Sequence, residues 1–367
     1  MASSEIPTCR WGIITTGLIS SWFVDDLVLP RPDAKARHVI QAIGTSSLDK
    51  ARAFAAKHLA LAATQPALYA SYDEVYADPD VDCVYIGTPH GFHKRDCLAA
   101  IAAGKNVLCE KAFTLNAREA REVFDAARAK GVYVAEAMWL RHRPMVADLR
   151  RLLYGEGGGP KAIGDVFRAT ADFQMYIDMK ALPATSRYKN LELGAGSLLD
   201  IGIYSLTWGI LMLDPQPPSA PEDPKIMAAQ SFVDGIEVTT SVILQYPSSG
   251  RQGLILSTTE RRGAKPGVIV TIDGTDGFVE VQGNVPSHPE AFTVYPKWED
   301  GADKPQGKRY DYKQAAQGFI YEADNTALDL AAGRKESSIM PWSETIRVME
   351  IMDEIRRQGG TKYPQDE

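Results

Sequence analysis

The chain has 367 residues and a formal net charge of −7, and 45% of its residues are hydrophobic. This length predicts about two domains of ordinary size, each with enough apolar residues for a core. The negative charge and the absence of a long basic run argue against binding to nucleic acid or to an anionic membrane. No apolar run approaches the roughly 18 residues of a membrane span, and the first eight residues do not resemble a signal peptide.

The four cysteines lie in the first third of the chain, inside apolar segments: Cys9, Cys83, Cys97 and Cys109. No two of them have the close spacing of a zinc site. Buried reduced thiols are typical of proteins in a reducing compartment. We therefore expect free cysteines, a cytoplasmic location and no bound metal.

Up to about residue 141, short apolar runs alternate with amphipathic segments. Strands are expected at 9–15, 39–45, 67–69, 81–87, 107–111 and 132–137, and helices at 18–29, 48–58, 72–77, 93–103 and 115–130, the last with Thr114 as N-cap. Such alternation is typical of parallel strands joined by right-handed crossovers. We predict an α/β fold whose N-terminal domain, residues 1–141, is a doubly wound parallel-sheet (Rossmann) domain that binds a dinucleotide.

After residue 141 the segments alternate between apolar and polar side chains with period two. Strands are expected at 166–175, 237–246, 253–259, 268–273 and 278–282, helices at 145–154, 197–212 and 343–357, and proline-rich loops at 215–224 and 285–305. Period-two alternation indicates a large, mostly antiparallel sheet with one open face. Residues 142–367 are predicted to form an α+β domain that binds substrate.

A glycine-containing turn joins the first expected strand to the first expected helix. Gly17 would let the backbone approach a pyrophosphate, and Leu18 and Ile19 open the helix whose N-terminus would bind it. Thr15 and Ser20 stand where the first and third glycines of a dinucleotide fingerprint usually fall, so the motif is degenerate. A plain structural turn is the alternative, but the place of this turn in the alternating series favours phosphate binding.

The second expected strand ends without the acidic residue that binds the ribose 2′-hydroxyl in many NAD sites. Ser46 and Ser47 occupy that region, and Lys50 follows one turn later. These side chains would accept a 2′-phosphate, so the sequence predicts NADP as cofactor. The alternative is that the two serines only cap the next helix.

Two further strand ends supply polar groups to the same edge of the predicted sheet. Thr88 and Pro89 would line a ribose of the cofactor, with His93 close behind as a cofactor contact or a helix-cap residue. Glu110 and Lys111 end the buried run at 107–111. Because such a strand delivers its end to the cleft of the sheet, we expect Lys111 beside the cofactor. The alternative is a lysine paired with Glu110.

In this order the motifs resemble the glucose–fructose oxidoreductase and inositol dehydrogenase family, over essentially the whole chain. The resemblance rests on residues 11–13 with 16–20, 87–89 with His93, 110–111, 136–139 with Arg141, and 194–204. It is strongest with the branch of NADP-dependent D-xylose 1-dehydrogenases and dimeric dihydrodiol dehydrogenases, which also has tyrosine at the position of Tyr204. Ala112 replaces the family's usual proline, which is expected to loosen the turn that aims Lys111.

The resemblance implies an NADP-dependent dehydrogenase in which hydride passes to the nicotinamide and Tyr204 is the acid/base. A neighbouring ammonium stabilises a phenolate and lowers the pKa of the phenol from about 10, which is the role implied for Lys111. Asp200 lies four residues before Tyr204, so the two share a helix face. Asp200 would bind a substrate hydroxyl or orient Lys111. A core aromatic is the alternative for Tyr204.

Four more residues complete the expected site. The resemblance places Arg141 near the nicotinamide or a phosphate, with Trp139 beside it as a contact of cofactor and substrate. Phe173 and Tyr176 would form an aromatic wall of the substrate pocket. The alternatives are an interdomain salt bridge for Arg141 and packing within the sheet for the two aromatic residues.

The first functional hypothesis is oxidation of an aldose, D-xylose first, at C1 to the lactone. The second is oxidation of trans-dihydrodiols of aromatic hydrocarbons, whose vicinal hydroxyls on a six-membered ring resemble those of a pyranose. A non-catalytic NADP sensor is the third, and it is disfavoured because a sensor needs neither Lys111 nor Tyr204. The family resemblance also implies a homodimer formed through the open face of the sheet.

Overall fold

The computed structural model of the protein describes residues 6–60, 62–155, 159–214, 222–263, 266–312 and 316–367. These residues divide into two compact units. The first holds the described residues up to Arg143 and those from 316 to Met349, and the second holds Pro144 to 312 and Glu350 to 367. The expected boundary at 141/142 lies close to the observed one, but residues 316–349 pack with the first unit and not, as predicted, with the second.

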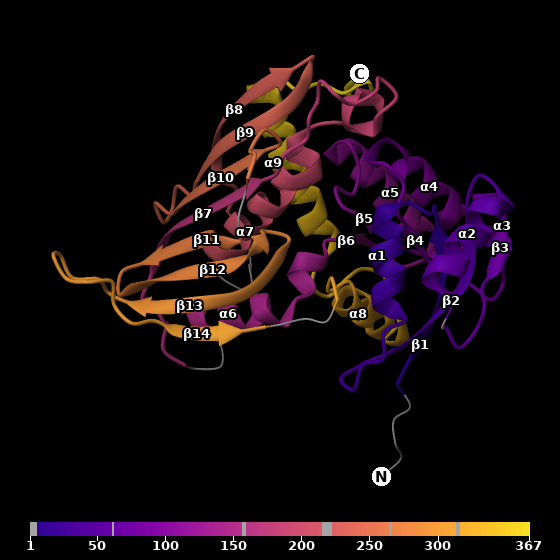
Figure 1. Ribbon diagram of the computed structural model, residues 1–367, viewed down its shortest axis with the longest axis horizontal. Helices are drawn as coiled ribbons and strands as arrows, with labels where there is room; N and C mark the ends of the chain where they lie inside the picture. The colour runs from indigo at the N-terminus through magenta and orange to yellow at the C-terminus, as the bar shows by residue number, and fades with distance from the viewer. Residues whose placement is uncertain (1–5, 61, 156–158, 215–221, 264–265, 313–315) are drawn as a thin grey trace, which may run out of the picture. The chain divides into compact units, whose positions relative to one another are not determined.

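The first unit contains a six-stranded parallel sheet in the order β3-β2-β1-β4-β5-β6 (Figure 1). Its strands are β1 (Thr8–Ile14), β2 (Arg37–Gly44), β3 (Ala67–Tyr69), β4 (Cys83–Ile86), β5 (Asn106–Glu110) and β6 (Val134–Ala137). The helices of this unit are α1 (Leu18–Leu27), α2 (Leu48–His58), α3 (Tyr72–Ala77), α4 (His90–Ala102), α5 (Ala117–Lys130) and α8 (Ile320–Ala331). The predicted Rossmann fold is confirmed, and its strand order reverses between β1 and β4, where such sheets bind ligands.

Among the predicted helices of the first unit, two begin at a different residue from the one expected. Helix α5 begins at Ala117 because the side chain of Asn116 accepts a hydrogen bond from the Glu119 N–H at 3.0 Å. The hydroxyl of Thr114, the predicted N-cap, instead donates to the Asn116 carbonyl. Helix α4 begins at His90, three residues before the expected start.

The second unit contains an eight-stranded sheet in the order β14-β13-β12-β11-β7-β10-β9-β8. Its strands are β7 (Val166–Gln174), β8 (Lys225–Val233), β9 (Ile236–Gln245), β10 (Gln252–Thr258), β11 (Gly267–Gly274), β12 (Gly277–Val285), β13 (His288–Pro296) and β14 (Lys308–Asp311). All neighbours are antiparallel except β7 and β10, so the predicted mostly antiparallel sheet is confirmed. The sequence did not predict β8, β13 or β14, and β13 lies in the region expected to be a loop.

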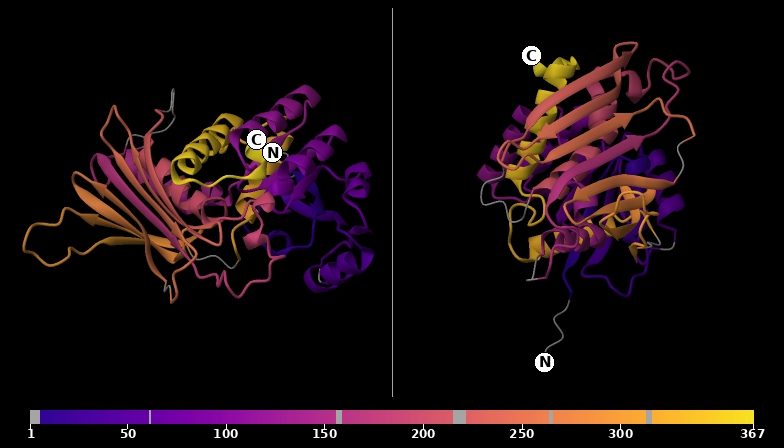
Figure 2. Two further views of the ribbon diagram at one scale, coloured as in Figure 1. Left: turned by 90° about the horizontal axis from the view of Figure 1, so that it is seen from above. Right: turned by 90° about the vertical axis from the view of Figure 1, so that its left-hand side faces the viewer.

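One face of this sheet is covered and the other is open. Helix α7 (Ile203–Leu213) packs on β7 and β10, and α6 (Pro144–Tyr154) packs against α7. The right-hand panel of Figure 2 shows the other face, which carries no helix. Residues 215–221 of the expected proline-rich loop at 215–224 lie outside the described residues. The last helix, α9 (Trp342–Gly359), continues from the first unit into the second.

One helical stretch, Leu191–Leu213, is long and apolar enough to cross a membrane by length and composition, which the sequence analysis did not anticipate. Its most apolar window has a mean hydropathy of 1.4, and 89% of that window is buried. A core helix passes the same test, and the contacts of α7 with β7 and β10 account for the burial.

Candidate functional site

The turn between β1 and α1 has the backbone features of a phosphate-binding turn. Thr15 has φ +73°, the left-handed conformation that the first glycine of a fingerprint normally supplies. Gly17 precedes α1, and no side chain caps the start of this helix. A Cβ on Gly17 would meet no protein atom within 4 Å, so packing does not require glycine there. The open space in front of uncapped N–H groups fits a pyrophosphate.

The close packing that the third fingerprint glycine usually permits is achieved differently here. Ser20 occupies that position and is fully buried. A Cβ on Gly87, at the end of β4, would lie 2.5 Å from the Ser20 hydroxyl and 3.1 Å from the side chain of Ile19. The glycine needed for close approach of helix and strand is therefore Gly87, on the facing strand.

At the end of β2, the helix-cap interpretation and the 2′-phosphate interpretation are compatible, because they use different side chains. The Ser47 hydroxyl caps α2 by accepting from the Lys50 N–H, as the structural alternative required. The Lys50 ammonium donates to the Ser46 hydroxyl at 2.8 Å, and both side chains are exposed. The structure thus brings together the cation and hydroxyl expected at a 2′-phosphate.

The end of β4 is organised by a buried histidine. His93 is 0% exposed, and its ring nitrogens lie 2.7 Å from the Thr88 carbonyl oxygen and 3.0 Å from the Ala112 carbonyl oxygen. Burial lowers the pKa of His93, and the facing carbonyl oxygens of Thr88, Ala112 and Phe113 oppose that shift. His93 thus bridges two loops, and its role as a cofactor contact stays a prediction. Thr88, whose hydroxyl donates to Asp96 at 2.9 Å, and Pro89 remain at the carboxyl end of β4.

Lys111 follows β5 and is 9% exposed. Its backbone N–H donates to the Glu110 carboxylate at 3.2 Å, and that carboxylate also accepts from the Tyr85 hydroxyl at 2.6 Å. The peptide bond from Lys111 to Ala112 is cis. The Glu110 carboxylate thus holds the strand end through the Tyr85 hydroxyl and the Lys111 N–H, and its role as a cofactor contact stays a prediction.

The turn after Lys111 is held from two sides. The Phe113 N–H donates to Glu136 at 3.2 Å, and the carbonyl oxygens of Ala112 and Phe113 face His93. Ala112 and Phe113 are fully buried. Burial raises the pKa of Glu136 to about 7, against the opposing effects of Thr345 and Arg141. Hydrogen bonds thus tie the turn at Ala112 to Glu136 of β6 and His93 of α4, and the loosening expected from alanine stays a prediction.

Trp139 and Arg141 lie in the short helix η1 (Trp139–His142) and are both buried. Arg141 forms an ion pair with Glu344 at 2.6 Å, and Trp139 stacks on Phe319 at 4.6 Å between ring centroids. Burial opposes ionisation of Glu344, yet Arg141 and Arg347 hold the pKa of that carboxyl below its usual range. Arg141 thus makes an ion pair, but its partner lies within the first unit and not, as the structural alternative supposed, across the domain boundary. Its contact with the cofactor stays a prediction.

In the second unit, Asp200 lies in the π-helical turn η4 (Leu198–Gly202), and Tyr204 follows in α7. Such turns within helices occur frequently at functional sites. The Tyr204 side chain is 4% exposed, and its ring centroid is 5.8 Å from that of Phe173 on β7. Phe173 is thus placed beside the predicted base. Tyr176 is exposed, and Arg262 stacks over its ring at 3.7 Å.

The sequence analysis missed Arg187. Its guanidinium lies 3.5 Å from both carboxylate oxygens of Asp200 and 2.8 Å from the hydroxyl of Tyr188. The Asp200 side chain is 17% exposed and that of Arg187 is 43% exposed, so both reach solvent. Arg187 begins the short 3₁₀ helix η2 (Arg187–Lys189), which is too short to give a periodic signal for the element that its side chain will meet.

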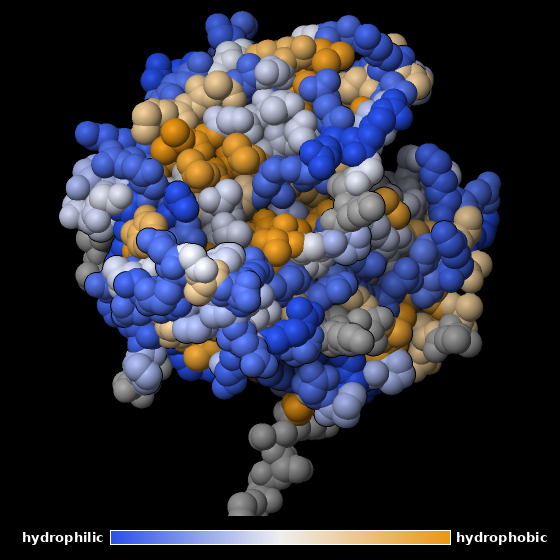
Figure 3. Space-filling view, turned by 60° about the vertical axis from the view of Figure 1, so that its left-hand side comes forward, coloured by the Kyte–Doolittle hydropathy of each residue, from blue (hydrophilic) through white to orange (hydrophobic). Residues whose placement is uncertain are grey.

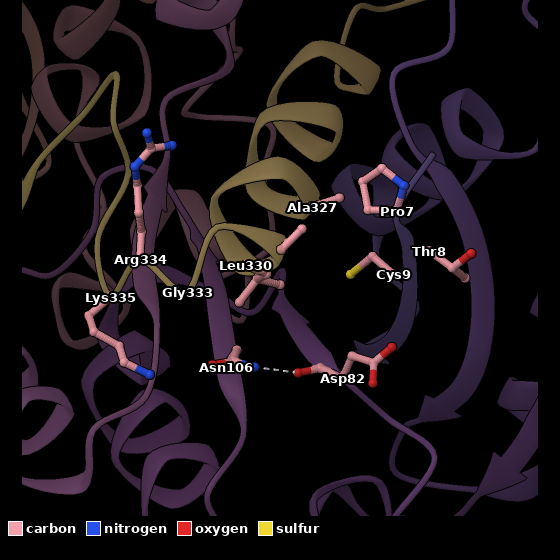
Figure 4. Close-up of a pocket in the computed structure, with 11 residues that line it drawn as sticks. Pro7, Thr8, Cys9, Asp82, Asn106, Ala327, Leu330, Gly333, Arg334 and Lys335 are labelled. Carbon is pink, nitrogen blue, oxygen red and sulfur yellow. Dashed lines mark hydrogen bonds between the residues drawn. The ribbon is translucent and has the colours of Figure 1, made fainter. Parts of the chain in front are cut away.

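The cavity drawn in Figure 4 lies elsewhere in the first unit. It has a volume of about 340 Å³ and is lined by Thr8, Asp82 and Asn106, at the amino ends of β1, β4 and β5, and by the end of α8. In a parallel sheet this edge is opposite to the carboxyl ends that carry Gly17 and Lys111. The cavity is therefore separate from the predicted cofactor site.

The sequence is similar to those of known proteins along the whole chain. Residues 9–138 match an oxidoreductase family described as having an NAD-binding Rossmann fold. A D-xylose 1-dehydrogenase (NADP(+)) from Hypocrea jecorina is 36% identical over 389 aligned residues, which cover 100% of this chain and 95% of that protein. The chain belongs to the glucose–fructose oxidoreductase and inositol dehydrogenase family. The resemblance inferred from the motifs is thereby confirmed.

Two other proteins are similar to this chain. A trans-1,2-dihydrobenzene-1,2-diol dehydrogenase from Sus scrofa is 33% identical over 97% of this chain and 98% of its own length. A crystal structure of a 3-ketoreductase from Actinomadura kijaniata has a TM-score of 0.77 with 20% identity, and the match covers 96% of this chain and 98% of that one. The last similarity supports the fold of the oxidoreductase and no more than the fold.

All four cysteines are free and buried, as expected. Within the described part of the chain, no group of three or more His, Cys, Asp or Glu side chains is arranged to hold a metal ion.

Proposed function

We propose that this oxidoreductase is an NADP-dependent dehydrogenase that oxidises an aldose, D-xylose first, at C1 to the lactone. The observation that carries the proposal is the pair formed by Arg187 and Asp200, one helical turn from Tyr204. A carboxylate and a guanidinium that both reach solvent can bind adjacent sugar hydroxyls through charge-assisted hydrogen bonds. In this proposal the open turn at Gly17 holds the cofactor pyrophosphate.

Each side chain has a role in this proposal. When bound, the nicotinamide would accept the hydride from C1. Tyr204 accepts the proton of the anomeric hydroxyl as general base. Lys111 stabilises the phenolate and the substrate oxygen by its positive charge. Asp200 and Arg187 orient the ring through its other hydroxyls, and Phe173 supplies an apolar surface beside Tyr204.

The runner-up is oxidation of aromatic trans-dihydrodiols. Its support is the name of relatives such as the Sus scrofa enzyme and the aromatic Phe173 beside Tyr204. The two hypotheses differ in what Arg187 and Asp200 contact, because a pyranose offers hydroxyls beyond the reacting pair and a dihydrodiol does not.

The test is a set of initial-rate measurements with NADP and with NAD against pentoses, hexoses and a trans-dihydrodiol. We expect the highest kcat/KM for D-xylose with NADP, at least about 10-fold above that with NAD, because Ser46 and Lys50 favour a 2′-phosphate. A higher kcat/KM for the dihydrodiol would establish the runner-up. Equal rates with both cofactors would contradict the role given to Ser46 and Lys50.

We also propose a cytoplasmic homodimer that forms through the open face of the eight-stranded sheet. Met227, Ile243 and Leu254 are neighbours across β8, β9 and β10 on this face, with Met227 50% and Ile243 37% exposed. Figure 3, turned towards this face, shows apolar patches among polar side chains. A charged side chain introduced among these apolar residues would lose its hydration when two subunits associate, which would weaken the dimer.

Sedimentation velocity should therefore show a dimer for the wild type and a monomer for Ile243→Lys. Ile339→Lys is the matched control, because Ile339 in the first unit is also 37% exposed, and this variant should stay dimeric. A monomeric wild type, or a dimeric Ile243→Lys, would refute the proposed interface.

A further inference from the structure

The helix that carries Asp200 and Tyr204 begins at a turn that the side chains of Glu237 and Tyr363 approach closely. Gly196 has φ +143°, a conformation that other residues rarely adopt. A Cβ on Gly196 would lie 3.0 Å from Oε2 of Glu237 and 3.4 Å from the hydroxyl oxygen of Tyr363. Glycine is required here because β9 and the C-terminal segment both approach the turn.

Glu237 makes a set of hydrogen bonds that only a carboxylate can accept. The Ser197 and Thr240 hydroxyls donate to its Oε1 at 2.5 Å and 2.7 Å, and the Leu198 N–H donates to its Oε2 at 2.9 Å. The residue is 1% exposed. Burial raises the pKa of Glu237, and the donors of Ser197, Leu198 and Thr240 oppose that rise. An amide in its place would turn a donor towards one of these donors.

This carboxylate replaces an ordinary helix cap. Ser197 is the N-cap residue of η4, yet it makes no capping hydrogen bond. Its hydroxyl is directed to Glu237, and Glu237 takes over the Leu198 N–H, one of the donors that a helix start leaves unsatisfied. The position of the first turn of this helix is therefore set by a residue of the sheet.

The other side of the turn is held by the C-terminal segment. The Tyr363 hydroxyl donates to the Ala195 carbonyl at 3.3 Å, and the Gln365 amide donates to the Glu192 carbonyl at 3.1 Å. Arg356 fixes this segment through an ion pair with Asp366 at 2.6 Å. With both sides held, the turn has little freedom to shift.

We propose that Glu237 is a positioning residue of the active site, whose carboxylate fixes the helix start and so holds Asp200 and Tyr204 in place for the substrate. This inference rests on the proposed function, because it assigns catalytic value to the position of those two residues. Displacement of a base by about 1 Å costs up to about 100-fold in rate. A group that only stabilised the fold would not act selectively on the sugar step.

The test compares Glu237→Gln with Glu119→Gln. Glu119 is also a buried carboxylate at a helix start and accepts from the Leu115 N–H at 3.3 Å, but it lies in α5 of the first unit. We expect both variants to lose a similar amount of Tm and to bind NADPH as the wild type does. Glu237→Gln should lower kcat/KM for D-xylose at least 10-fold, whereas Glu119→Gln should stay within twofold of the wild type. Equal sugar kinetics in the two variants would overturn the proposal.

Amide hydrogen exchange gives a second measurement that needs no turnover. Glu237→Gln should raise exchange at residues 197–204 at least 10-fold over the wild type, and Glu119→Gln should not. A wild type inactive on every aldose and diol would refute the proposed function. Unchanged exchange in Glu237→Gln would instead refute the proposal that Glu237 fixes the helix start. If Glu237→Gln does not fold, Thr240→Val serves as a second variant. It removes one of the three hydrogen bonds to Glu237 and replaces a buried side chain by one of similar size. It should lower kcat/KM about 3-fold and raise the same exchange, and wild-type values for both would refute the proposal.

Discussion

Tyr204→Phe should lower kcat for D-xylose by about 10³-fold or more and leave NADPH affinity unchanged. General base catalysis contributes about 10²–10⁴-fold, and phenylalanine removes the proton acceptor completely. The substitution conserves packing, because the tyrosine is 4% exposed and its ring lies beside Phe173. Stopped-flow turnover and a fluorescence titration with NADPH measure the two quantities separately.

Tyr312→Phe is the matched control for this experiment. Tyr312 lies in the same unit, and its hydroxyl donates to Asp148 at 2.8 Å, so the control also removes one phenolic hydrogen bond. It should keep kcat within about twofold of the wild type. A Tyr204→Phe enzyme with more than a tenth of wild-type turnover would exclude Tyr204 as the base.

The sequence predicted the first sheet well because its strands are buried on both faces. Strand β4 is apolar and buried at every position, and continuous apolar runs of this kind are characteristic of parallel sheets. The sequence did not predict α8, which belongs to the same unit. The segment just before this helix is held by Asp26 of α1, whose carboxylate accepts from the N–H groups of Gly318 and Phe319 across more than 290 residues of chain. A contact with so distant a residue has no local signature.

The second sheet was predicted in part, for a reason visible in β13. This strand carries Pro289 and Pro296, which usually argue against a strand because proline cannot donate to a ladder. Both residues sit near its ends, so the ladder between them is intact. Strand β8 has small or polar residues at the consecutive positions 228–231 and no strong apolar period. Local patterns under-predict strands of this kind.

Within the candidate site, the sequence located residues more reliably than it assigned their contacts. Gly17, Lys111 and Tyr204 lie on the elements that the motifs indicated. His93 and Arg141 lie there too, but the sequence did not indicate their partners, the Ala112 carbonyl and Glu344. Arg187 and Glu237 were missed because each acts through a partner in another element. Position follows from periodicity, whereas side-chain partners depend on long-range packing.

Gly17→Val should reduce NADPH affinity at least about 100-fold without lowering Tm. No protein atom lies within 4 Å of a Cβ at this position, so the valine fits the protein. Its side chain fills the space in front of the α1 N-terminus, where the backbone must approach the pyrophosphate closely. An NADPH titration and a thermal melt of the same sample test both parts of this result.

Gly12→Ala should give the opposite pattern. Gly12 lies in β1, and a Cβ there would come within 2.6 Å of the Val75 side chain and 2.9 Å of the Val81 side chain. Overpacking of this kind costs about 1–3 kcal/mol, so Tm should fall while the folded protein still binds NADPH. If Gly17→Val binds NADPH normally, the pyrophosphate does not lie at this turn. If Gly17→Val instead loses stability as Gly12→Ala does, glycine is needed there for the fold and not for the cofactor.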